Sequence, residues 1–170
     1  MLYNVATLLK EPTGAVREYH VEEALVSAWD EGEPPVVEGT VHMLRTLRGI
    51  LVTARLTTSE PEECSRCLEQ YWQVLTPEIE EEFFPIVDVA TGAPVPPPEE
   101  DAFSIGADHV LDLTEAVRQA ILLARPMKPL CSEDCAGLCP DCGQNLNIAT
   151  CGCRGEPVDP RWESLKQLLK

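Results

Sequence analysis

The stretch that decides the fold of this chain is CSEDCAGLCPDCGQNLNIATCGC, residues 131–153, which holds six of its eight cysteines. The other two, Cys64 and Cys67, lie in Cys-Ser-Arg-Cys, so the cysteines come in four pairs whose members are separated by one to three residues. A short turn points two thiolates at one ion, and four thiolates complete a tetrahedral zinc site. The sequence therefore predicts two structural zinc ions.

Two partitions of the pairs are compatible with the spacing. In the simpler one, the ligands of the first site are Cys64, Cys67, Cys131 and Cys135. The ligands of the second site are Cys139, Cys142, Cys151 and Cys153. The second site closes locally, because only eight residues separate its two pairs. The first closes a long loop, which costs only about 0.6 kcal/mol per doubling of loop length. The other partition interleaves the pairs and joins Cys64 and Cys67 to Cys139 and Cys142.

Other chemistries of paired cysteines fit the sequence less well. Disulfide frameworks belong to oxidising compartments, whereas Lys10-Glu11-Pro12 interrupts the N-terminal apolar stretch before it reaches the length of a signal peptide. We therefore expect a cytoplasmic protein with reduced thiols. The acidic pair Glu62-Glu63 beside Cys64 disfavours a reactive thiolate, so dithiol redox catalysis is not expected. Iron–sulfur ligation stays open as the alternative to zinc.

The cysteine pattern indicates structural rather than catalytic metal. Eight cysteines complete two closed shells, whereas a catalytic zinc keeps an open position and usually has a histidine or carboxylate ligand. His20, His42 and His109 are scattered outside the cysteine motifs. His20-Val21-Glu22 matches half of a nucleobase deaminase signature, but the Pro-Cys half is missing. We expect a protein that is not an enzyme, with a zinc-dependent hydrolase as a remote alternative.

Charge limits the kind of partner. The chain has 29 acidic and 13 basic residues, for a formal net charge of −16, and such a field repels phosphate backbones at long range. The acidic surface either keeps the protein soluble or attracts a basic partner. The sequence has no apolar run near the roughly 20 residues that span a bilayer, so no membrane partner is expected.

Alternating apolar residues predict an antiparallel sheet. Residues 36–47 and 49–58 are rich in Val, Ile, Leu and Thr and form a hairpin that turns at Arg48-Gly49. Residues 60–63 end the second strand, and the next strand covers residues 71–84. The first cysteine pair then lies on the turn between two antiparallel strands, where zinc knuckles are usually found.

One main helix is predicted after the sheet. Asp112 is its N-cap, Glu115 follows three residues later, and Pro126 ends it. Its apolar face packs on the sheet and consists of Leu113, Val117, Ala120, Ile121 and Ala124. A second helix is expected at the C-terminus, where Asp159-Pro160 precedes an apolar stripe that includes Trp162 and Leu165.

These elements predict an α+β fold, in which an antiparallel β-sheet is packed by one main helix and followed by a Cys-rich, zinc-ribbon-like lobe and a C-terminal helix. Residues 1–130 form the sheet and helix body, and residues 92–101 form an exposed Pro-rich acidic loop within it. Residues 131–170 form the zinc lobe and the C-terminal helix. Cys64 and Cys67 join this lobe to the body.

Several motifs together resemble one family. They are Cys64-Ser-Arg-Cys-Leu68, Leu111-Asp-Leu113, Pro129-Leu-Cys131, Cys135-Ala-Gly-Leu-Cys-Pro-Asp-Cys-Gly143, Leu146-Asn147 and Asp159-Pro-Arg161. From the first cysteine pair to its end, the chain resembles the YceD family of large ribosomal RNA subunit accumulation proteins. The resemblance implies a non-enzymatic bacterial factor needed for normal levels of 23S rRNA, often encoded beside a large-subunit ribosomal protein.

Combining the resemblance with charge gives two functional readings. In the first, the protein is an acidic adaptor for a basic large-subunit ribosomal protein or assembly factor, and no small-molecule substrate is expected. In the second, the zinc lobe binds 23S rRNA directly, through basic residues in or beside it. These possible RNA or partner contacts are Arg66, Arg125, Lys128 and Arg154.

Overall fold

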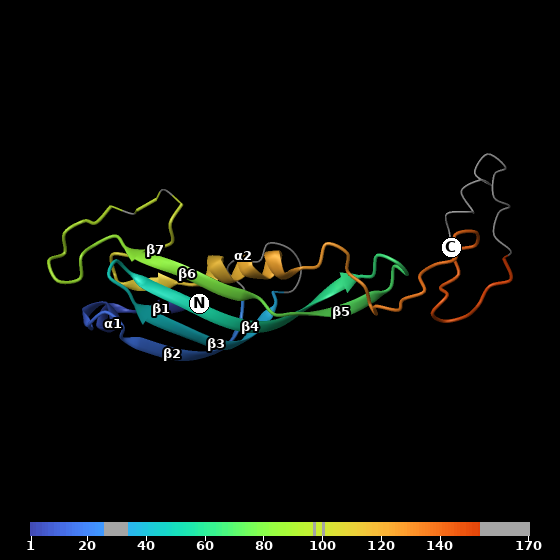
Figure 1. Cartoon of the computed structure of the whole chain (residues 1–170), viewed down its shortest axis with the longest axis horizontal. Helices are drawn as coiled ribbons and strands as arrows, with labels where there is room; N and C mark the ends of the chain where they lie inside the picture. The colour runs from blue at the N-terminus through green and yellow to red at the C-terminus, as the bar shows by residue number, and fades with distance from the viewer. Residues whose placement is uncertain (26–33, 97, 100, 154–170) are drawn as a thin grey trace, which may run out of the picture. The chain divides into compact units, whose positions relative to one another are not determined.

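The computed structural model describes residues 1–25, 34–96, 98–99 and 101–153, and Figure 1 shows its elements. Within the described residues, helices and strands end at Ala124. In chain order they are β1 (Leu2–Asn4), α1 (Ala6–Lys10), β2 (Val16–Ala24), β3 (Val36–Arg45), β4 (Ile50–Glu63), β5 (Gln70–Leu75), β6 (Glu78–Pro85), β7 (Ser104–Ile105), β8 (Val110–Asp112) and α2 (Thr114–Ala124). No helix in these ranges is long and apolar enough to cross a membrane.

The described residues divide into two compact units. The sheet unit comprises Met1–Pro61 and Trp72–Met127, and the cysteine unit comprises Glu62–Tyr71 together with residues 128–153. Strands β4 and β5 each begin in one unit and end in the other, so the turn between them, with Cys64 and Cys67, belongs to the cysteine unit. The cysteine unit otherwise consists of turns and loops.

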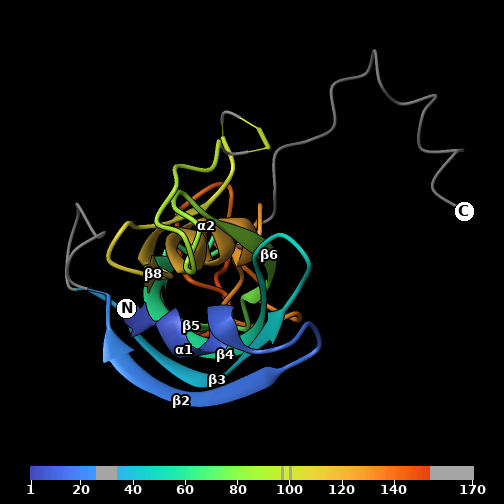
Figure 2. The ribbon, with the colours of Figure 1, turned by 90° about the vertical axis from the view of Figure 1, so that its left-hand side faces the viewer.

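The sheet unit is built on one sheet with strand order β1-β8-β7-β6-β4-β3-β2, and β5 pairs with β4 beside this path. Figure 2 shows the sheet curling into a half-barrel, with α1 and α2 on its concave side. The predicted hairpin is confirmed, because β3 and β4 pair antiparallel from Glu38↔Thr57 to Arg45↔Ile50. The sheet is not wholly antiparallel, however, since β6 and β7 pair in parallel.

Strand β4 supplies the centre of the core. Its side chains alternate as the sequence predicts, with Ile50, Val52, Ala54 and Leu56 facing the core. They pack against Phe83 of β6, which is fully buried, as are Val117 and Ile121 of α2. Burying one such side chain contributes about 1.5–3 kcal/mol to folding. This apolar contact between sheet and helix holds the unit together.

Two strand boundaries differ from the prediction. Strand β4 does not end at residue 60 but continues through Pro61 to Glu63. The ladder with β3 ends at Thr57, so the missing N–H of Pro61 removes no bond on that side. The run predicted as one strand at residues 71–84 is broken at Thr76-Pro77 into β5 and β6, because Pro77 cannot donate to a ladder.

The predicted capping of the main helix is also different. Asp112 is the last residue of β8, and Leu113 occupies the N-cap position. The Asp112 carboxylate accepts the backbone N–H of Thr114 at 2.9 Å. Glu115 does not reach back to the cap but pairs with Arg118 at 2.7 Å. The helix ends before Pro126 as predicted, because Arg125 already has extended backbone.

Sequence reasoning left the N-terminus unassigned, and the described residues of the Pro-rich loop are exposed, as predicted. Helix α1 is a second helix beside the predicted main one, and it buries Leu8 and Leu9. The loop is not wholly unpaired: the Val95 N–H donates to Ile86 O at 2.8 Å, and Val87 bridges Pro94. A tight turn at Gly92, where φ is +69°, allows this fold-back. The predicted C-terminal helix lies outside the described residues.

Candidate metal centres

The structure gathers the eight cysteines into two groups of four. Within each group the Sγ atoms all lie within 4.8 Å of one another. The first centre contains Cys64, Cys67, Cys131 and Cys135, and the second contains Cys139, Cys142, Cys151 and Cys153. This is the simpler of the two partitions that the spacing allows, and the interleaved one does not occur.

The sulfur separations in the first centre match those of a tetrahedral zinc site. Cys64 Sγ lies 3.8 Å from Cys135 Sγ, and Cys67 Sγ lies 3.7 Å from Cys131 Sγ. A zinc–sulfur bond of about 2.3 Å in a tetrahedron requires sulfur atoms about 3.8 Å apart. A disulfide would instead need a sulfur separation of about 2.05 Å, and all eight cysteines are free.

The turn after Cys64 has the geometry of a zinc knuckle. The Leu68 N–H donates to Cys64 O at 2.9 Å, and the Cys64 N–H donates to Glu69 O at 3.0 Å. Closing the turn places Leu68 at φ +59°, in the left-handed region that favours glycine. Leu68 is therefore a strained position, although its side chain is more than half exposed.

The turn after Cys139 repeats the same hydrogen bonds. The Gly143 N–H donates to Cys139 O at 2.9 Å, and the Cys139 N–H donates to Gln144 O at 2.8 Å. Gly143 has φ +74° and occupies the position that Leu68 has in the first turn. The chain thus builds both knuckles with one backbone design but uses glycine in only one of them. The sequence motif revealed Gly143 but not the strain at Leu68.

Hydrogen bonds favour the thiolate form of Cys64 and Cys135 in the first centre and of Cys139 in the second. The backbone N–H of Cys131 is the main cause that lowers the pKa of Cys64 to about 6. The backbone N–H of Cys142 does most to lower the pKa of Cys139 to about 7. Burial raises the pKa of Cys131 to about 12, and the Cys142 side chain does most to raise the pKa of Cys153 to about 12.

This pattern follows from crowding four thiols into each centre. Ionisation of one thiol opposes ionisation of its neighbours, so part of each group stays protonated unless a cation is present. A divalent ion removes this repulsion and is bound as the protons leave. The donor set, the spacing and the prepared thiolates therefore fit zinc in both centres.

The first centre is buried except at Cys131, which is exposed, and main-chain contacts hold it together. Cys64, Cys67 and Cys135 are buried, and a small apolar cluster formed by Tyr71, Leu130 and Leu138 packs on them. The Ser65 N–H donates to Pro129 O at 2.9 Å, which joins the knuckle to the segment leading to Cys131. These contacts bring together residues that are far apart in sequence.

Arg66 joins the turn that carries Cys64 and Cys67 to the segment that carries Cys135. Its Nη1 donates to Glu133 O at 3.1 Å and to Cys135 O at 2.9 Å. The backbone O of Arg66 accepts the Leu138 N–H at 3.1 Å. A side chain at Gly137 would lie 3.1 Å from that same oxygen, so glycine allows the close approach.

Asn147 links the loop of the second centre to a ligand of the first. It lies between Cys142 and Cys151, yet its Nδ2 donates to Cys135 Sγ at 3.3 Å. Its Oδ1 accepts the Ala136 N–H at 2.7 Å, which fixes the amide orientation. An outer-shell donor of this kind orients a metal ligand and tunes its charge. Sequence reasoning included Asn147 in a family motif but did not assign it this role.

The second centre is more open than the first. Cys139 is buried, Cys151 is half-buried, and Cys142 and Cys153 are exposed. The knuckle supplies its first pair of ligands, and the second pair comes from the loop that ends at Cys153. The two centres therefore have similar ligands but different access to solvent.

The basic residues predicted as possible RNA or partner contacts are not all free. Arg66 makes the internal contacts described above, and Arg125 of the sheet unit pairs with the buried Glu60 at 2.7 Å. Lys128 of the cysteine unit is exposed. Arg154 lies outside the described residues. The contact role of these four residues stays a prediction.

Comparison with known proteins places this arrangement in a family. A family model described as large ribosomal RNA subunit accumulation protein YceD matches residues 52–169. An uncharacterized protein of Mycobacterium tuberculosis is 36% identical over 125 residues, which cover 71% of this chain and 56% of that protein. An uncharacterized protein of Mycobacterium leprae is 30% identical over 123 residues, covering 71% of this chain and 53% of that protein.

A more distant relative is the uncharacterized protein YlbN of Bacillus subtilis, 36% identical over 73 residues that cover 42% of each chain. The chain spans about half the length of the mycobacterial relatives it matches. No solved structure matches it. The family match includes all eight cysteines and covers more than half of the chain, and this protein therefore belongs to the YceD family.

Proposed function

We propose that this protein is a zinc-binding, non-enzymatic factor that supports accumulation of the large ribosomal RNA subunit. We further propose that it works as an acidic adaptor for a basic ribosomal or assembly protein. The family description supports the process. The formal net charge of −16 is the observation that carries the choice of partner, because such a charge steers cationic proteins toward the molecule and phosphate backbones away.

The role we assign to zinc is structural. In each centre all four ligands would be thiolates, which leaves no open position for water or substrate. In the first centre, bound zinc would join the β4–β5 turn to the segment that follows α2. In the second, it would hold the loop that carries Asn147. Both would stabilise the cysteine unit, because metal binding to an assembled site adds directly to folding free energy.

The outer face of the sheet offers a surface for a basic partner. Strand register places on this face a set of glutamates from β2, β3 and β6: Glu18, Glu22, Glu38, Glu78, Glu80 and Glu82. Arg55 pairs with Glu78 at 2.6 Å, and Arg48 pairs with Glu82 at 3.3 Å. Within the described residues, no cation pairs with Glu22, Glu38 or Glu80.

Glu22 and Glu38 support this assignment most directly. They lie opposite each other on β2 and β3, where like charges destabilise a sheet by roughly 0.2–1 kcal/mol. A cationic partner would relieve this repulsion on binding. The internal contacts of Arg66 and Arg125 reduce the cationic groups available for the alternative, direct binding of rRNA.

The test is a pull-down of tagged protein before and after nuclease treatment. We expect a basic ribosomal or assembly protein to remain bound without RNA, with weaker binding as salt rises. A triple variant, Glu22→Lys, Glu38→Lys and Glu80→Lys, is expected to lose that protein. The matched control, Glu63→Lys, Glu99→Lys and Glu133→Lys, changes net charge equally at exposed positions elsewhere.

Two results would contradict the adaptor reading. One is loss of every bound protein after nuclease treatment, with tight binding of purified protein to naked 23S rRNA at physiological salt. The other is equal loss of the partner in the triple variant and in its control, which would show only a general charge effect. The cellular readout is the level of 23S rRNA after removal of the gene, which we expect to fall.

A further inference from the structure

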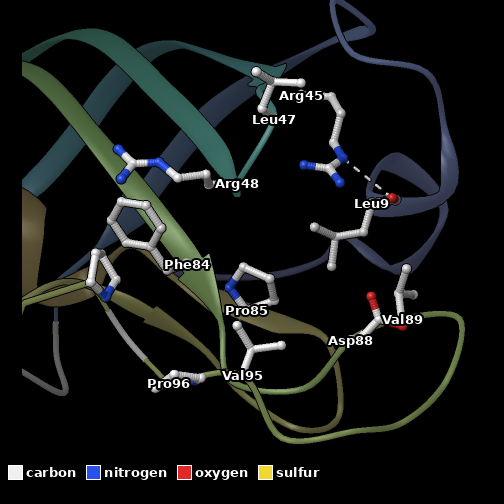
Figure 3. Close-up of a pocket in the computed structure, with 11 residues that line it drawn as sticks. Leu9, Arg45, Leu47, Arg48, Phe84, Pro85, Asp88, Val89, Val95 and Pro96 are labelled. Atoms are coloured by element: carbon white, nitrogen blue, oxygen red, sulfur yellow. Dashed lines mark hydrogen bonds between the residues drawn. The ribbon is translucent and has the colours of Figure 1, made fainter.

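The sheet unit contains a cavity of about 310 Å³ that the proposed function does not use. It lies between α1, the turn that follows β3, and the segment that follows β6 (Figure 3). A volume of this size is at the lower end of the roughly 300–1,000 Å³ of small-ligand sites. Its apolar wall is formed by Leu9, Leu47, Phe84, Pro85, Val95 and Pro96.

Arg45 contributes a fixed positive charge to this cavity. Its Nε donates to Leu9 O at 3.2 Å, and its Nη1 donates to Thr46 O at 2.6 Å and Gly49 O at 2.9 Å. These three carbonyls hold the guanidinium without neutralising its charge. No carboxylate in the described part of the chain pairs with Arg45, and its Nη2 has no partner there.

The view in Figure 3 shows the Arg45 guanidinium pointing into the space beside Leu9 and Pro85. Arg48 also lines the cavity, but its charge is already satisfied. The Arg48 guanidinium lies over the Phe84 ring, 5.3 Å from its centre, and pairs with Glu82 at 3.3 Å. Arg45 is therefore the cavity's uncompensated cation.

Asp88 limits the charge that a ligand can carry. It lines the same cavity, and its Oδ1 accepts the backbone N–H groups of Ala90 and Thr91 and the Thr91 hydroxyl. The Thr91 hydroxyl is the main cause that lowers the pKa of Asp88, so this carboxylate stays ionised. A ligand with several negative charges would be repelled by Asp88, whereas a single anionic group could approach Arg45 alone.

We propose that this cavity binds an apolar monocarboxylate, with the carboxylate on Arg45 Nη2 and the apolar body against Leu9, Pro85 and Val95. Such a ligand is either a small organic acid or the C-terminal residue of a polypeptide. A guanidinium already held in place loses little freedom on binding, which favours a charge-assisted hydrogen bond. The proposal does not depend on zinc or on the ribosomal role.

The position of the cavity in the sequence separates it from the family match. Leu9, Arg45, Leu47 and Arg48 precede residue 52, where the match to the family model begins. The cavity therefore combines this chain's N-terminal third with the loop that folds back through the Val95–Ile86 hydrogen bond. That fold-back places Val95 in the cavity wall.

The test is a titration of the zinc-loaded full chain with hexanoate, followed by methyl NMR. We expect saturable shifts of the Leu9, Leu47 and Val95 methyl signals. Hexanamide, the neutral analogue, is expected to bind at least tenfold more weakly, because a hydrogen bond between charged groups is lost. Arg45→Gln is expected to weaken hexanoate about tenfold or more, whereas the control Arg55→Gln, on the outer sheet face, should not.

A second pair of probes distinguishes the sources of the carboxylate. They are an acetylated pentapeptide ending in leucine, as the free acid and as the C-terminal amide. Tighter binding of the free acid than of hexanoate assigns the cavity to a polypeptide C-terminus, and the reverse order assigns it to a small acid.

The proposal is wrong if none of the carboxylates shifts these methyl signals at millimolar concentration. It is also wrong if hexanamide binds as tightly as hexanoate. The comparison of these two probes uses the unmodified chain, so it holds even if Arg45→Gln fails to fold.

Discussion

The sharpest prediction concerns Asn147, through which the loop of the second centre contacts the first. Asn147→Ala removes the donor 3.3 Å from Cys135 Sγ and leaves the Ala136 N–H without its 2.7 Å acceptor. Loss of an outer-shell partner typically costs tenfold to hundredfold in metal affinity. This corresponds to about 1.4–2.8 kcal/mol, at 1.4 kcal/mol for each factor of ten. We expect a loss of that size in zinc affinity at the first centre.

The assay is competition with a chromophoric chelator. The full loss is expected in the unmodified chain, and a smaller loss is expected in a background where Cys142→Ser has removed a ligand of the second centre. Asn147→Asp separates the two roles of the side chain, because it keeps the acceptor for Ala136 but presents a carboxylate oxygen to the Cys135 thiolate. It is expected to bind zinc at least as weakly as Asn147→Ala. Ile148→Ala is the matched control, since Ile148 lies in the same loop and its side chain is largely exposed.

Linkage between the centres follows from the same contact. If zinc in the second centre holds the loop that positions Asn147, then it raises zinc affinity at the first centre, and the reverse holds by thermodynamic necessity. Cys142→Ser alone should therefore weaken zinc at the first centre as well, in the same direction as Asn147→Ala. The reasoning is refuted if Asn147→Ala binds zinc as tightly as Ile148→Ala, or if the first centre is unaffected by loss of the second.

Three further predictions follow from the two centres and from α2. Both Leu68 and Gly143 have positive φ, so Leu68→Gly should raise the free energy of unfolding by about 1 kcal/mol and Gly143→Leu should lower it by about 1–2 kcal/mol. Denaturant titration measures both changes. Opposite or absent changes would contradict the shared knuckle design. Metal analysis should find two zinc ions per chain. A chelator should empty the second centre before the first, because Cys142 and Cys153 of the second centre are exposed. Release of both ions in one step would contradict this order. The side-chain hydrogen bond from Arg118 is the main cause that lowers the pKa of Glu115 to about 2. A carboxyl whose pKa is lower in the folded state stabilises the fold at pH values above its unfolded pKa of about 4.3, and this contribution is lost as pH falls toward 2. Glu115→Gln should therefore make the free energy of unfolding depend less on pH over that acid range. An unchanged pH profile would show that the pair contributes nothing.

The ligands of both centres could be predicted from the sequence because knuckle geometry is local. A cysteine pair separated by two residues fixes its own turn, and the short loop from Cys142 to Cys151 favours closure within the second centre. The hairpin of β3 and β4 was predictable for the same reason, since alternating burial and a short connection identify two neighbouring strands. Predictions failed where pairing joins distant residues: Leu2 of β1 pairs with Asp112 of β8, and nothing near either residue indicates the other.

The same division between local and distant contacts explains why residue type was a poor guide to the role of the arginines. A basic residue beside a metal centre suggests a contact for RNA, but the sequence does not show which acceptors the fold brings to it. Arg66 meets the carbonyls of Glu133 and Cys135, and Arg125 meets a buried carboxylate 65 residues away. Among the residues that the structure describes, Arg45 meets only carbonyls. Arg66 is also held by carbonyls alone in this part of the chain, but Arg45 differs from it in lining a cavity, and this combination is what supports the proposed carboxylate site.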